Sequence, residues 1–326
     1  MRVARFKTPF EVDIEEVPKP KPGPNEVLIR VMACAICASD AEIIRGGNPN
    51  PGHEIAGVVE EVGEGVKRVK AGDRVTIYWK LGCGECPYCR AGFDVHCERP
   101  RYLAWNGYGE YVVAHEEACL PLPEGVDFIE GSLLTDTLGT PYAAVMSARV
   151  SGERVAVWGC GPLGLMCVQL CLELGARDVI AVDPISSRRE MALKLGASLA
   201  VDPTAENPVE ALRKFAPPLG PRVAICATRS DDAGRAAMNG VPPEGRVVYI
   251  AGQPGELDRH RWAYRIHYFK RTDYESVAEL ASRRGVRLKE LVSHTYPLER
   301  VREAFEMRFR NPHKSLKVVV LPHEGC

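Results

Sequence analysis

The chain has 326 residues, of which 45% are hydrophobic and 26% charged, and its formal net charge at pH 7 is −1. Such a balance creates no overall basic field, which argues against a nucleic-acid partner or an anionic membrane surface. The N-terminal residues have no apolar leader segment, and no apolar run reaches the roughly 20 residues of a membrane span. We therefore expect two domains, at about 100–200 residues each, in a cytoplasmic protein.

The first part of the chain, to about residue 140, has the pattern of strands and turns. Short runs rich in β-branched residues are separated by Gly, Pro, Asn and Asp. The predicted strands are Glu26–Met32, Glu54–Val62, Arg74–Trp79 and Tyr111–Ala114. This pattern predicts a mainly antiparallel β domain with short helices.

Four cysteines are clustered within this part: Cys83, Cys86, Cys89 and Cys97. The two-residue gaps, in a stretch rich in glycine and proline, let tight turns direct several sulfurs to one point. A closed structural zinc site with four sulfur ligands is the prediction. Disulfides are the alternative, but they need an oxidising compartment, and the other eight cysteines are scattered, several of them in apolar runs.

The pattern changes near residue 130, where Ile129–Ala148 has apolar residues at helical spacing. An alternation of apolar strands and helices then predicts a doubly wound parallel sheet covered on both faces. Its predicted strands are Arg154–Trp158, Asp178–Val182, Arg222–Cys226 and Arg246–Ile250, and its helices include Leu163–Leu174 and Ser187–Leu195. Two helices, Tyr274–Ser282 and Leu298–Phe309, and a strand, Leu316–Leu321, are predicted in the tail.

A glycine-rich turn follows the strand Arg154–Trp158 and opens a helix. Gly159 would form the tight turn, Gly161 would let a pyrophosphate approach the backbone, and Gly164 would allow close packing of helix and strand. Asp183, nineteen residues after Gly164, ends the next strand, where a carboxylate binds the adenine ribose of a dinucleotide. The alternative is that the glycines are plain turn residues and Asp183 a strand-end cap.

The same loop and the following helix complete the predicted dinucleotide site. Pro162 and Leu163 lie between the last two glycines, at the positive N-terminus of the helix where phosphates bind. The carboxylate of Asp183 would repel a 2′-phosphate, so NAD is favoured over NADP. Arg188 and Arg189 follow closely and would weaken that preference.

Taken together, these motifs resemble those of the zinc-containing alcohol dehydrogenases in the medium-chain dehydrogenase/reductase family. The resemblance spans essentially the whole chain. Besides the four cysteines and the glycine turn, it is carried by Cys37-x-Ser39-Asp40, Gly52-His53-Glu54, Ala71-Gly-Asp-Arg-Val75 and His294-Thr-Tyr-Pro-Leu298.

The resemblance implies a GroES-like catalytic zinc domain at residues 1–138, to which residues 271–326 return. It also implies a Rossmann coenzyme domain at residues 139–270. Two zinc ions per chain, NAD as the redox cofactor and assembly into a homodimer or homotetramer follow from the same resemblance.

The resemblance also supplies the catalytic residues. Cys37 and His53 match ligands of the catalytic zinc, and Ser39 matches the residue that passes on the proton of the alcohol. Asp40 would support the ligand histidine. Glu54 would lie behind the metal as a transient ligand.

The third zinc ligand is assigned to Asp136, four residues before Thr140, in the segment that precedes the coenzyme domain. Thr140 would face the nicotinamide. A Cys/His/Asp set resembles the sugar, polyol and formaldehyde branches of the family more than the simple alcohol branch. The structural alternative is that Asp136 caps a helix turn.

The chain departs from the family pattern at two points. Glu42 occupies a position where the family often has a histidine that extends the proton relay. The loop between the first two zinc ligands is also shorter than usual. Trp79 matches a position that lines the substrate pocket, and Trp105 and Tyr108 either line it too or belong to the β-domain core.

These residues predict a zinc-dependent dehydrogenase that transfers hydride between the hydroxyl of an alcohol, polyol or sugar and NAD(P). Zinc would bind the substrate oxygen and stabilise its alkoxide form. The alternatives are a zinc-free reductase of activated double bonds from the same superfamily and a zinc-ribbon binding protein.

Overall fold

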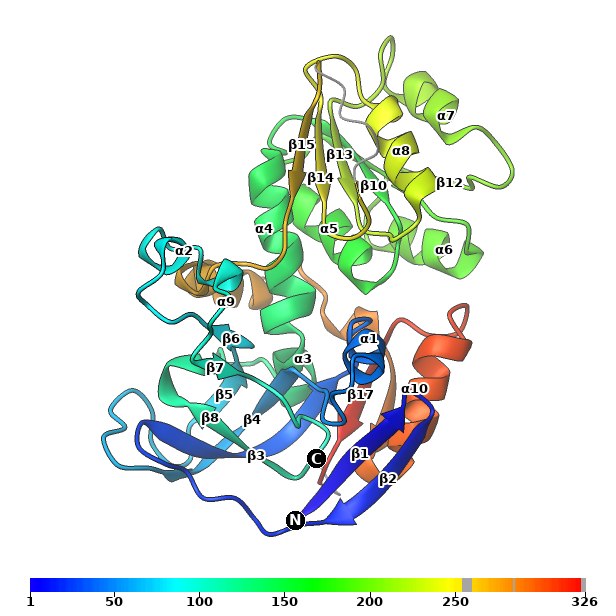
Figure 1. Ribbon diagram of the computed structural model, residues 1–326. Coiled ribbons are helices and arrows are strands. Elements are labelled where there is room, and N and C mark those ends of the chain that lie inside the picture. Colours follow the sequence, from blue (N-terminus) through cyan, green and yellow to red (C-terminus); the bar gives the residue numbers. More distant parts are fainter. Residues whose placement is uncertain (254–259, 284, 324–326) are drawn as a thin grey trace. The chain divides into compact units, whose positions relative to one another are not determined.

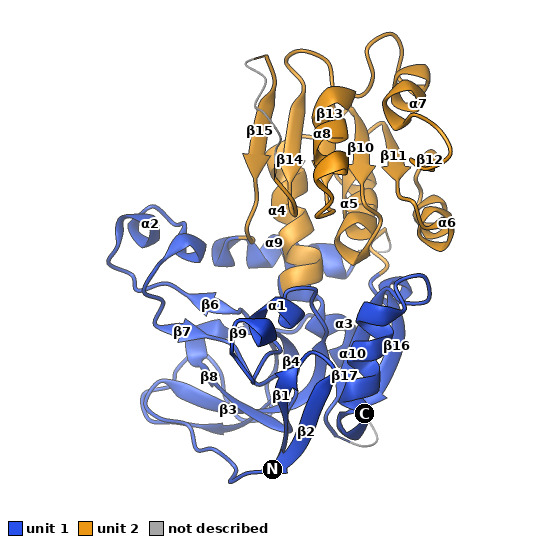
Figure 2. Cartoon of the chain, turned by 45° about the vertical axis from the view of Figure 1, so that its right-hand side comes forward, with its two compact units in different colours: residues 1–135, 270–282, 288–326 blue, residues 136–269, 283–287 orange. Residues whose placement is uncertain are grey.

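The chain forms two compact units in the computed structural model, which describes residues 1–253, 260–283 and 285–323 (Figure 2). Unit 1 comprises residues 1–135, 270–282 and 288–326, and unit 2 comprises residues 136–269 and 283–287. Within the described residues, the helices are too short or too polar to cross a membrane.

Unit 1 is built on a seven-stranded sheet in the order β16-β17-β3-β4-β5-β9, with β8 added beside β3 (Figure 1). Only β16 and β17 run parallel; the other pairs are antiparallel. The strands are β3 (Glu26–Ala35), β4 (Glu54–Val62), β5 (Arg74–Ile77), β8 (Tyr111–His115), β9 (Cys119–Pro121), β16 (Val292–Pro297) and β17 (Lys317–Leu321).

Smaller elements complete unit 1. Two antiparallel pairs, β1 (Arg2–Thr8) with β2 (Glu11–Glu16) and β6 (Lys80–Leu81) with β7 (Tyr102–Leu103), lie outside the large sheet. The helices are α1 (Asp40–Arg45), α2 (Pro87–Arg90), α3 (Phe128–Ser132), α9 (Tyr274–Ala281) and α10 (Val301–Arg310).

Unit 2 contains a parallel sheet of six strands in the order β12-β11-β10-β13-β14-β15. The strands are β10 (Arg154–Trp158), β11 (Asp178–Val182), β12 (Leu199–Val201), β13 (Val223–Cys226), β14 (Arg246–Tyr249) and β15 (Trp262–Arg265). The order reverses between β10 and β13, which is the switch point where dinucleotides bind in such sheets. A mainly antiparallel β unit and a doubly wound parallel unit confirm the predicted fold class.

Helices cover both faces of this sheet (Figure 1). Residues of α7 and α8 pack with Trp158 and Tyr249 in one apolar cluster, and α4 and α5 pack on the opposite face. The helices are α4 (Gly139–Ala148), α5 (Pro162–Glu173), α6 (Ser186–Lys194), α7 (Pro208–Phe215) and α8 (Asp231–Gly240). Both faces of the sheet are therefore buried, as the continuous apolar strands require.

The segment Ile129–Ala148 is helical, as its apolar spacing indicates, but it is not one regular helix. Helix α3 ends at Ser132, a π-helical turn, η3, covers Leu134–Leu138, and α4 begins at Gly139. Asp136 lies in the π turn. Such wider turns are rare and are concentrated at functional sites, and apolar periodicity does not reveal them.

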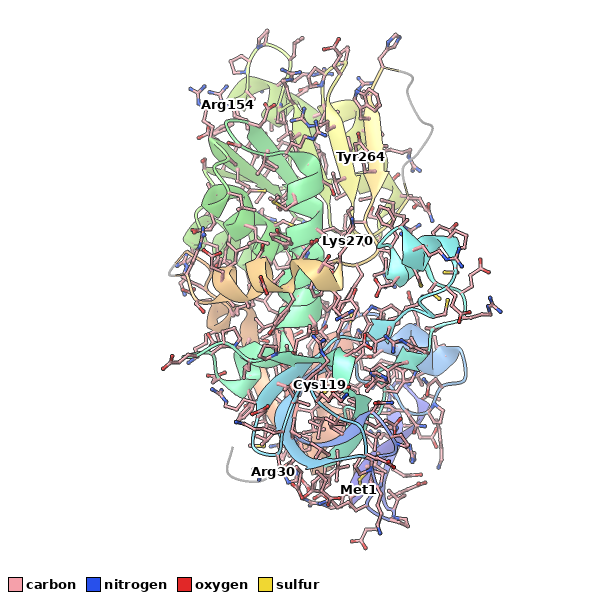
Figure 3. The ribbon with its side chains drawn as sticks, turned by 90° about the vertical axis from the view of Figure 1, so that its left-hand side faces the viewer. Met1, Arg30, Cys119, Arg154, Tyr264 and Lys270 are labelled. Carbon is pink, nitrogen blue, oxygen red and sulfur yellow. The ribbon has the colours of Figure 1, made fainter. Side chains whose placement is uncertain are left out.

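Strand β15 forms an edge of the parallel sheet, since it pairs only with β14 among the described residues. Its Ala263 packs into the apolar cluster on the α8 side, so Trp262 and Tyr264 point to the opposite face. Trp262 is 60% exposed and Tyr264 (labelled in Figure 3) 44% exposed. An edge strand with exposed aromatic side chains is a template for pairing with another chain.

Candidate functional site

Four of the predicted metal-ligating side chains are brought together. Ligand atoms of Cys37, His53, Glu54 and Asp136 all lie within 4.8 Å of one another. Cys37 is half-buried and the other three are buried. A thiol, an imidazole and carboxylate oxygens are donors that zinc accepts, so this set of residues fits a zinc ion.

The pairing of two strands explains why Cys37 and His53 meet. Strands β3 and β4 are antiparallel, and the last residue of β3, Ala35, lies opposite the first residue of β4, Glu54. Cys37 follows Ala35 by two residues and His53 precedes Glu54 by one. Both residues therefore lie at the same end of one strand pair.

Asp40 connects the segments that carry these two residues. Its Oδ2 accepts a hydrogen bond from the Cys37 backbone N–H at 2.9 Å, and its Oδ1 accepts one from the Gly52 N–H at 3.3 Å. The same Oδ1 lies 3.4 Å from His53 Nδ1. Asp40 thus faces one ring nitrogen of His53 and leaves Nε2 as the nitrogen available to a metal.

Glu54 forms a buried ion pair that the sequence did not reveal. Its Oε1 accepts a hydrogen bond from Lys317 Nζ, which also lies 3.4 Å from the Ile36 carbonyl oxygen. Glu54 is fully buried, and the Lys317 side chain is 4% exposed. Removing one partner of such a buried ion pair typically lowers the free energy of unfolding by about 3–5 kcal/mol. The only sequence signal is a lysine at the start of an otherwise apolar strand, β17.

Asp136 is held by the residue four positions later. Thr140 Oγ1 donates a hydrogen bond to Asp136 Oδ1 at 2.9 Å, and both side chains are buried. The boundary between the units falls directly before Asp136, which is bonded to Thr135, the last residue of that segment of unit 1. The Thr140 hydroxyl therefore orients the candidate ligand, while contact with a nicotinamide stays a prediction.

Ser39 lies beside Cys37. Its hydroxyl donates to Cys37 Sγ at 3.2 Å, and the side chain is half-buried. Glu42, on the next turn of the chain in α1, is exposed. Ser39 is thus placed where a proton relay from the metal would begin.

Two tryptophans lie near the imidazole of His53. The ring centroids of Trp79 and Trp105 are each 6.3 Å from that of His53 and 6.5 Å from each other. Both indoles are half-buried, as expected for walls of an open site. Tyr108 differs, since it is only 1% exposed and belongs to the core behind Asp40.

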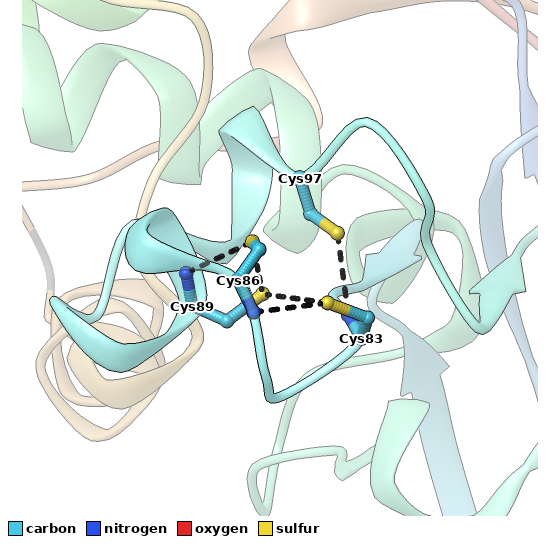
Figure 4. Close-up of side chains that lie close together, drawn as sticks. All are labelled: Cys83, Cys86, Cys89 and Cys97. Atoms are coloured by element: carbon cyan, nitrogen blue, oxygen red, sulfur yellow. Dashed lines mark hydrogen bonds between the residues drawn. The ribbon is translucent and has the colours of Figure 1, made fainter.

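The four clustered cysteines form the second candidate metal site (Figure 4). Cys89 Sγ lies 3.4 Å from Cys86 Sγ and 3.9 Å from Cys83 Sγ, far beyond the ~2 Å of a disulfide. Backbone N–H groups of Glu85 and Cys86 point at Cys83 Sγ and lower the pKa of that thiol to about 6. Burial instead raises the pKa of the neighbouring Cys89 thiol to about 12. The convergence of four sulfurs at non-bonded distances therefore favours a metal over a disulfide.

A short segment positions these sulfurs. Gly82 has no room for a side chain, because an added Cβ would lie 2.4 Å from Cys89 Sγ. The Cys86 thiol also caps α2 by accepting the Cys89 N–H. Strands β6 and β7 close the segment, and Lys80 Nζ donates to the Val95 carbonyl oxygen at 2.8 Å. We refer to residues 80–103 as the cysteine lobe.

The glycine turn of unit 2, residues 159–164, has the geometry of a dinucleotide-binding turn. Gly159 has φ +87°, and a Cβ on Gly164 would lie 1.8 Å from the Gly159 carbonyl oxygen. Gly161 differs, since apart from its chain neighbours no described residue has an atom within 4 Å of its ideal Cβ position. Pro162 begins α5 directly after it. The turn therefore packs tightly on one side and leaves open space at the helix N-terminus, where a pyrophosphate binds.

Asp183 is buried at the end of β11 and is joined to this turn. Its Oδ2 accepts the Cys160 N–H at 2.7 Å, and its Oδ1 accepts the Ile185 N–H at 2.8 Å. Arg188 Nη1 lies 3.9 Å from the same carboxylate. Arg189 instead pairs with Asp202 at 2.8 Å and donates to the Asp183 carbonyl oxygen. Among the described residues, Arg188 is thus the cation that faces the Asp183 carboxylate.

Known proteins are similar to this chain in sequence. Residues 23–124 match the family described as alcohol dehydrogenase GroES-like domain, and residues 162–281 match zinc-binding dehydrogenase. An alcohol dehydrogenase from Geobacillus stearothermophilus is 34% identical over 267 residues, which cover 78% of each chain. An L-threonine 3-dehydrogenase from Pyrococcus abyssi is 28% identical over 94% of each chain.

A solved structure extends the match to the whole chain. Alcohol dehydrogenase TADH from Thermus sp. ATN1 has a TM-score of 0.90 at 28% identity, covering 98% of this chain and 99% of that chain. Zinc and NAD(P) are the cofactors of this fold and site, and the chain is an oxidoreductase that acts on CH–OH groups. The chain belongs to the zinc-containing alcohol dehydrogenase family of the medium-chain dehydrogenases/reductases.

Proposed function

We propose that the chain is a dehydrogenase that oxidises a hydroxyl group of an alcohol, polyol or sugar at a catalytic zinc held by Cys37, His53 and Asp136. The cluster of these side chains within 4.8 Å of one another carries the proposal. Three protein ligands leave one tetrahedral position for substrate. Glu54 is close as well, but its charge is balanced by Lys317, so it is assigned a supporting place behind the metal.

The bound cofactors would supply Lewis-acid polarisation of the substrate oxygen and a hydride acceptor. The chain itself would orient the substrate and move its proton. Ser39 donates a hydrogen bond to Cys37 Sγ. Its hydroxyl would rotate to give this proton outward as its oxygen accepts the proton of the substrate hydroxyl. Trp79 and Trp105 would form flat walls beside His53, which favours slender substrates or sugar rings that stack on an indole.

Metal content tests this proposal against the alternatives. Purified protein is expected to hold two zinc ions per chain, one at the catalytic cluster and one at the cysteine lobe. A zinc-free reductase that kept the lobe, or a zinc-ribbon protein, would hold one. A screen of alcohols, polyols and sugars with NAD and NADP would then identify the substrate class, and absence of turnover in a two-zinc protein would contradict the proposal.

We also propose that NAD is preferred over NADP, because the buried carboxylate of Asp183 lies at the predicted ribose site. Asp183→Asn is expected to shift the ratio of kcat/KM for NADP over NAD upward by at least about tenfold, since the repulsion between two anions disappears. Steady-state kinetics with both cofactors measures the ratio. Adding Arg188→Ala to this variant should reverse part of the gain, and an unchanged ratio in both variants would contradict the assignment.

Self-association through strand β15 is proposed as well. Among the described residues the strand pairs with β14 alone, and its two aromatic side chains are exposed. Aromatic residues are enriched at the centres of interfaces. Trp262→Glu combined with Tyr264→Glu is expected to yield monomers in light scattering. Leu193→Glu is the control, because Leu193 is 48% exposed on α6, which packs against β12 at the other end of the sheet. An oligomer that survives the double substitution would rule out this surface.

A further inference from the structure

The hydroxyl of Tyr108 forms a hydrogen bond that has no role in the reaction proposed above. It donates a hydrogen bond to Asp40 Oδ2 at 2.6 Å, and Tyr108 and Asp40 are 1% and 0% exposed. Burial and the neighbouring carboxylate raise the pKa of Tyr108 well above its ordinary value, so the hydroxyl keeps its proton and can donate. A 2.6 Å O–H···O⁻ distance is typical of a charge-assisted hydrogen bond.

Asp40 depends on such donors because it is a buried carboxylate. In the described part of the chain, no lysine or arginine forms an ion pair with it, unlike Glu54 with its Lys317. The Cys37 N–H and the Tyr108 hydroxyl occupy Oδ2, while the Gly52 N–H and His53 Nδ1 face Oδ1. Removing the Tyr108 donor would leave one oxygen with a single partner and free the carboxylate to rotate away from His53.

The position of Tyr108 is fixed independently of Asp40. Its ring packs edge-on against Phe6 and Phe305, with centroids 5.9 Å and 5.4 Å away. Its carbonyl oxygen accepts the Ala4 N–H at 2.8 Å. The segment before it is joined to the histidine segment, since the Gly107 N–H donates to the Gly52 carbonyl oxygen at 3.0 Å.

We propose that Tyr108 is a positioning residue for the catalytic metal, which holds Asp40 so that Asp40 in turn orients His53. The inference rests on the proposed zinc site at Cys37 and His53. Tyr108 touches neither substrate nor cofactor. Its effect should therefore appear first in metal affinity, for which loss of an outer hydrogen-bond partner typically costs 10–100-fold.

Tyr108→Phe tests the inference, because it removes only the hydroxyl and keeps the packed ring. We expect the zinc affinity of the catalytic site to fall at least about tenfold, measured by chelator competition, with the lobe zinc retained. In cobalt-substituted protein, the visible absorption of the catalytic site should shift as the ligand geometry changes. These readouts do not depend on turnover.

Tyr274→Phe is the matched control. Tyr274 is 5% exposed in the same unit and donates its hydroxyl to the Pro121 carbonyl oxygen at 2.6 Å, away from the metal ligands. Its substitution should lower thermal stability without changing zinc affinity. Wild-type affinity in Tyr108→Phe would overturn the inference and leave the proposed function intact, whereas a single zinc ion in the wild type would overturn both.

A double-mutant cycle tests whether Tyr108 acts through Asp40. Asp40→Asn should weaken zinc binding, and adding Tyr108→Phe should weaken it no further, because the carboxylate that needs the donor is gone. If Tyr108→Phe alone does not fold, the double variant should fold and should have the zinc affinity of Asp40→Asn. Additive losses, or a double variant that still fails to fold, would overturn the inference.

Discussion

Replacing Cys37 with serine is expected to lower turnover by about a thousandfold or more, while NAD affinity stays at the wild-type value. A serine hydroxyl is a poor zinc ligand at neutral pH, and several kcal/mol of charge stabilisation in the transition state depend on the metal. The predicted dinucleotide residues, Gly159–Gly164 and Asp183, all lie in unit 2, whereas Cys37 lies in unit 1. Steady-state kinetics, zinc analysis and NAD titration measure the three quantities.

Cys89→Ser provides the matched control for this variant. It also removes one thiol and should also leave one zinc ion per chain, but the ion lost is that of the cysteine lobe. We expect lower thermal stability and a chain that binds NAD, with the catalytic zinc still in place. If Cys37→Ser kept more than a tenth of wild-type turnover, the ligand assignment would be wrong.

Gly164→Ala is expected to destabilise unit 2 by about 3 kcal/mol and lower its melting temperature by roughly 10 °C. The cause is steric, because the added Cβ would lie 1.8 Å from the Gly159 carbonyl oxygen and helix α5 would have to move away from β10. Scanning calorimetry of the whole chain measures the effect.

Gly161→Ala separates packing from ligand binding. Apart from its chain neighbours, no described residue has an atom within 4 Å of the added Cβ, so the melting temperature should be unchanged. That space is where the pyrophosphate would approach, so NAD affinity should fall by roughly tenfold or more. Equal stability of Gly164→Ala and wild type would contradict the packing role, and unchanged NAD affinity in Gly161→Ala would contradict the pyrophosphate site.

The features that could be predicted from sequence are those encoded by neighbouring residues. The glycine turn between β10 and α5 is recognisable because each glycine has a local steric task. The four cysteines of the lobe are recognisable because their spacing is short. Apolar runs of β10, β11, β13 and β14 are continuous because helices bury both faces of the sheet, and this pattern correctly predicted a doubly wound parallel unit.

The residues of the proposed catalytic cluster could not be predicted from neighbouring residues in this way. No spacing rule relates Cys37, His53 and Asp136, so only the family resemblance could suggest them. Their proximity depends on the register of β3 against β4 and on a π-helical turn, neither of which apolar periodicity encodes. The same holds for Lys317 and for the hydroxyl of Tyr108, whose partners lie in other segments of the chain.

The short edge strand β15 was not predicted. Its exposed Trp262 and Tyr264 interrupt the buried pattern of the other parallel strands, so periodicity indicated no strand there. An edge strand that faces solvent on one side needs apolar residues on its other face only. The four residues of β15 are too few to show the alternation of apolar and polar residues that marks such a strand. Residues such as Ala263, which packs inward, become informative only when the pairing with β14 is known.

The ion pair of Glu54 with Lys317 has a consequence for the order in which the two metal sites mature. The partners are 263 residues apart, whereas Cys83 and Cys97, the ends of the sulfur cluster, are 14 apart. During synthesis, the cysteine lobe could therefore bind its proposed metal soon after it leaves the ribosome. The proposed catalytic cluster would reach charge balance only when β17 has been made and added beside β3. A nascent chain would thus carry one metal long before it is able to hold the second.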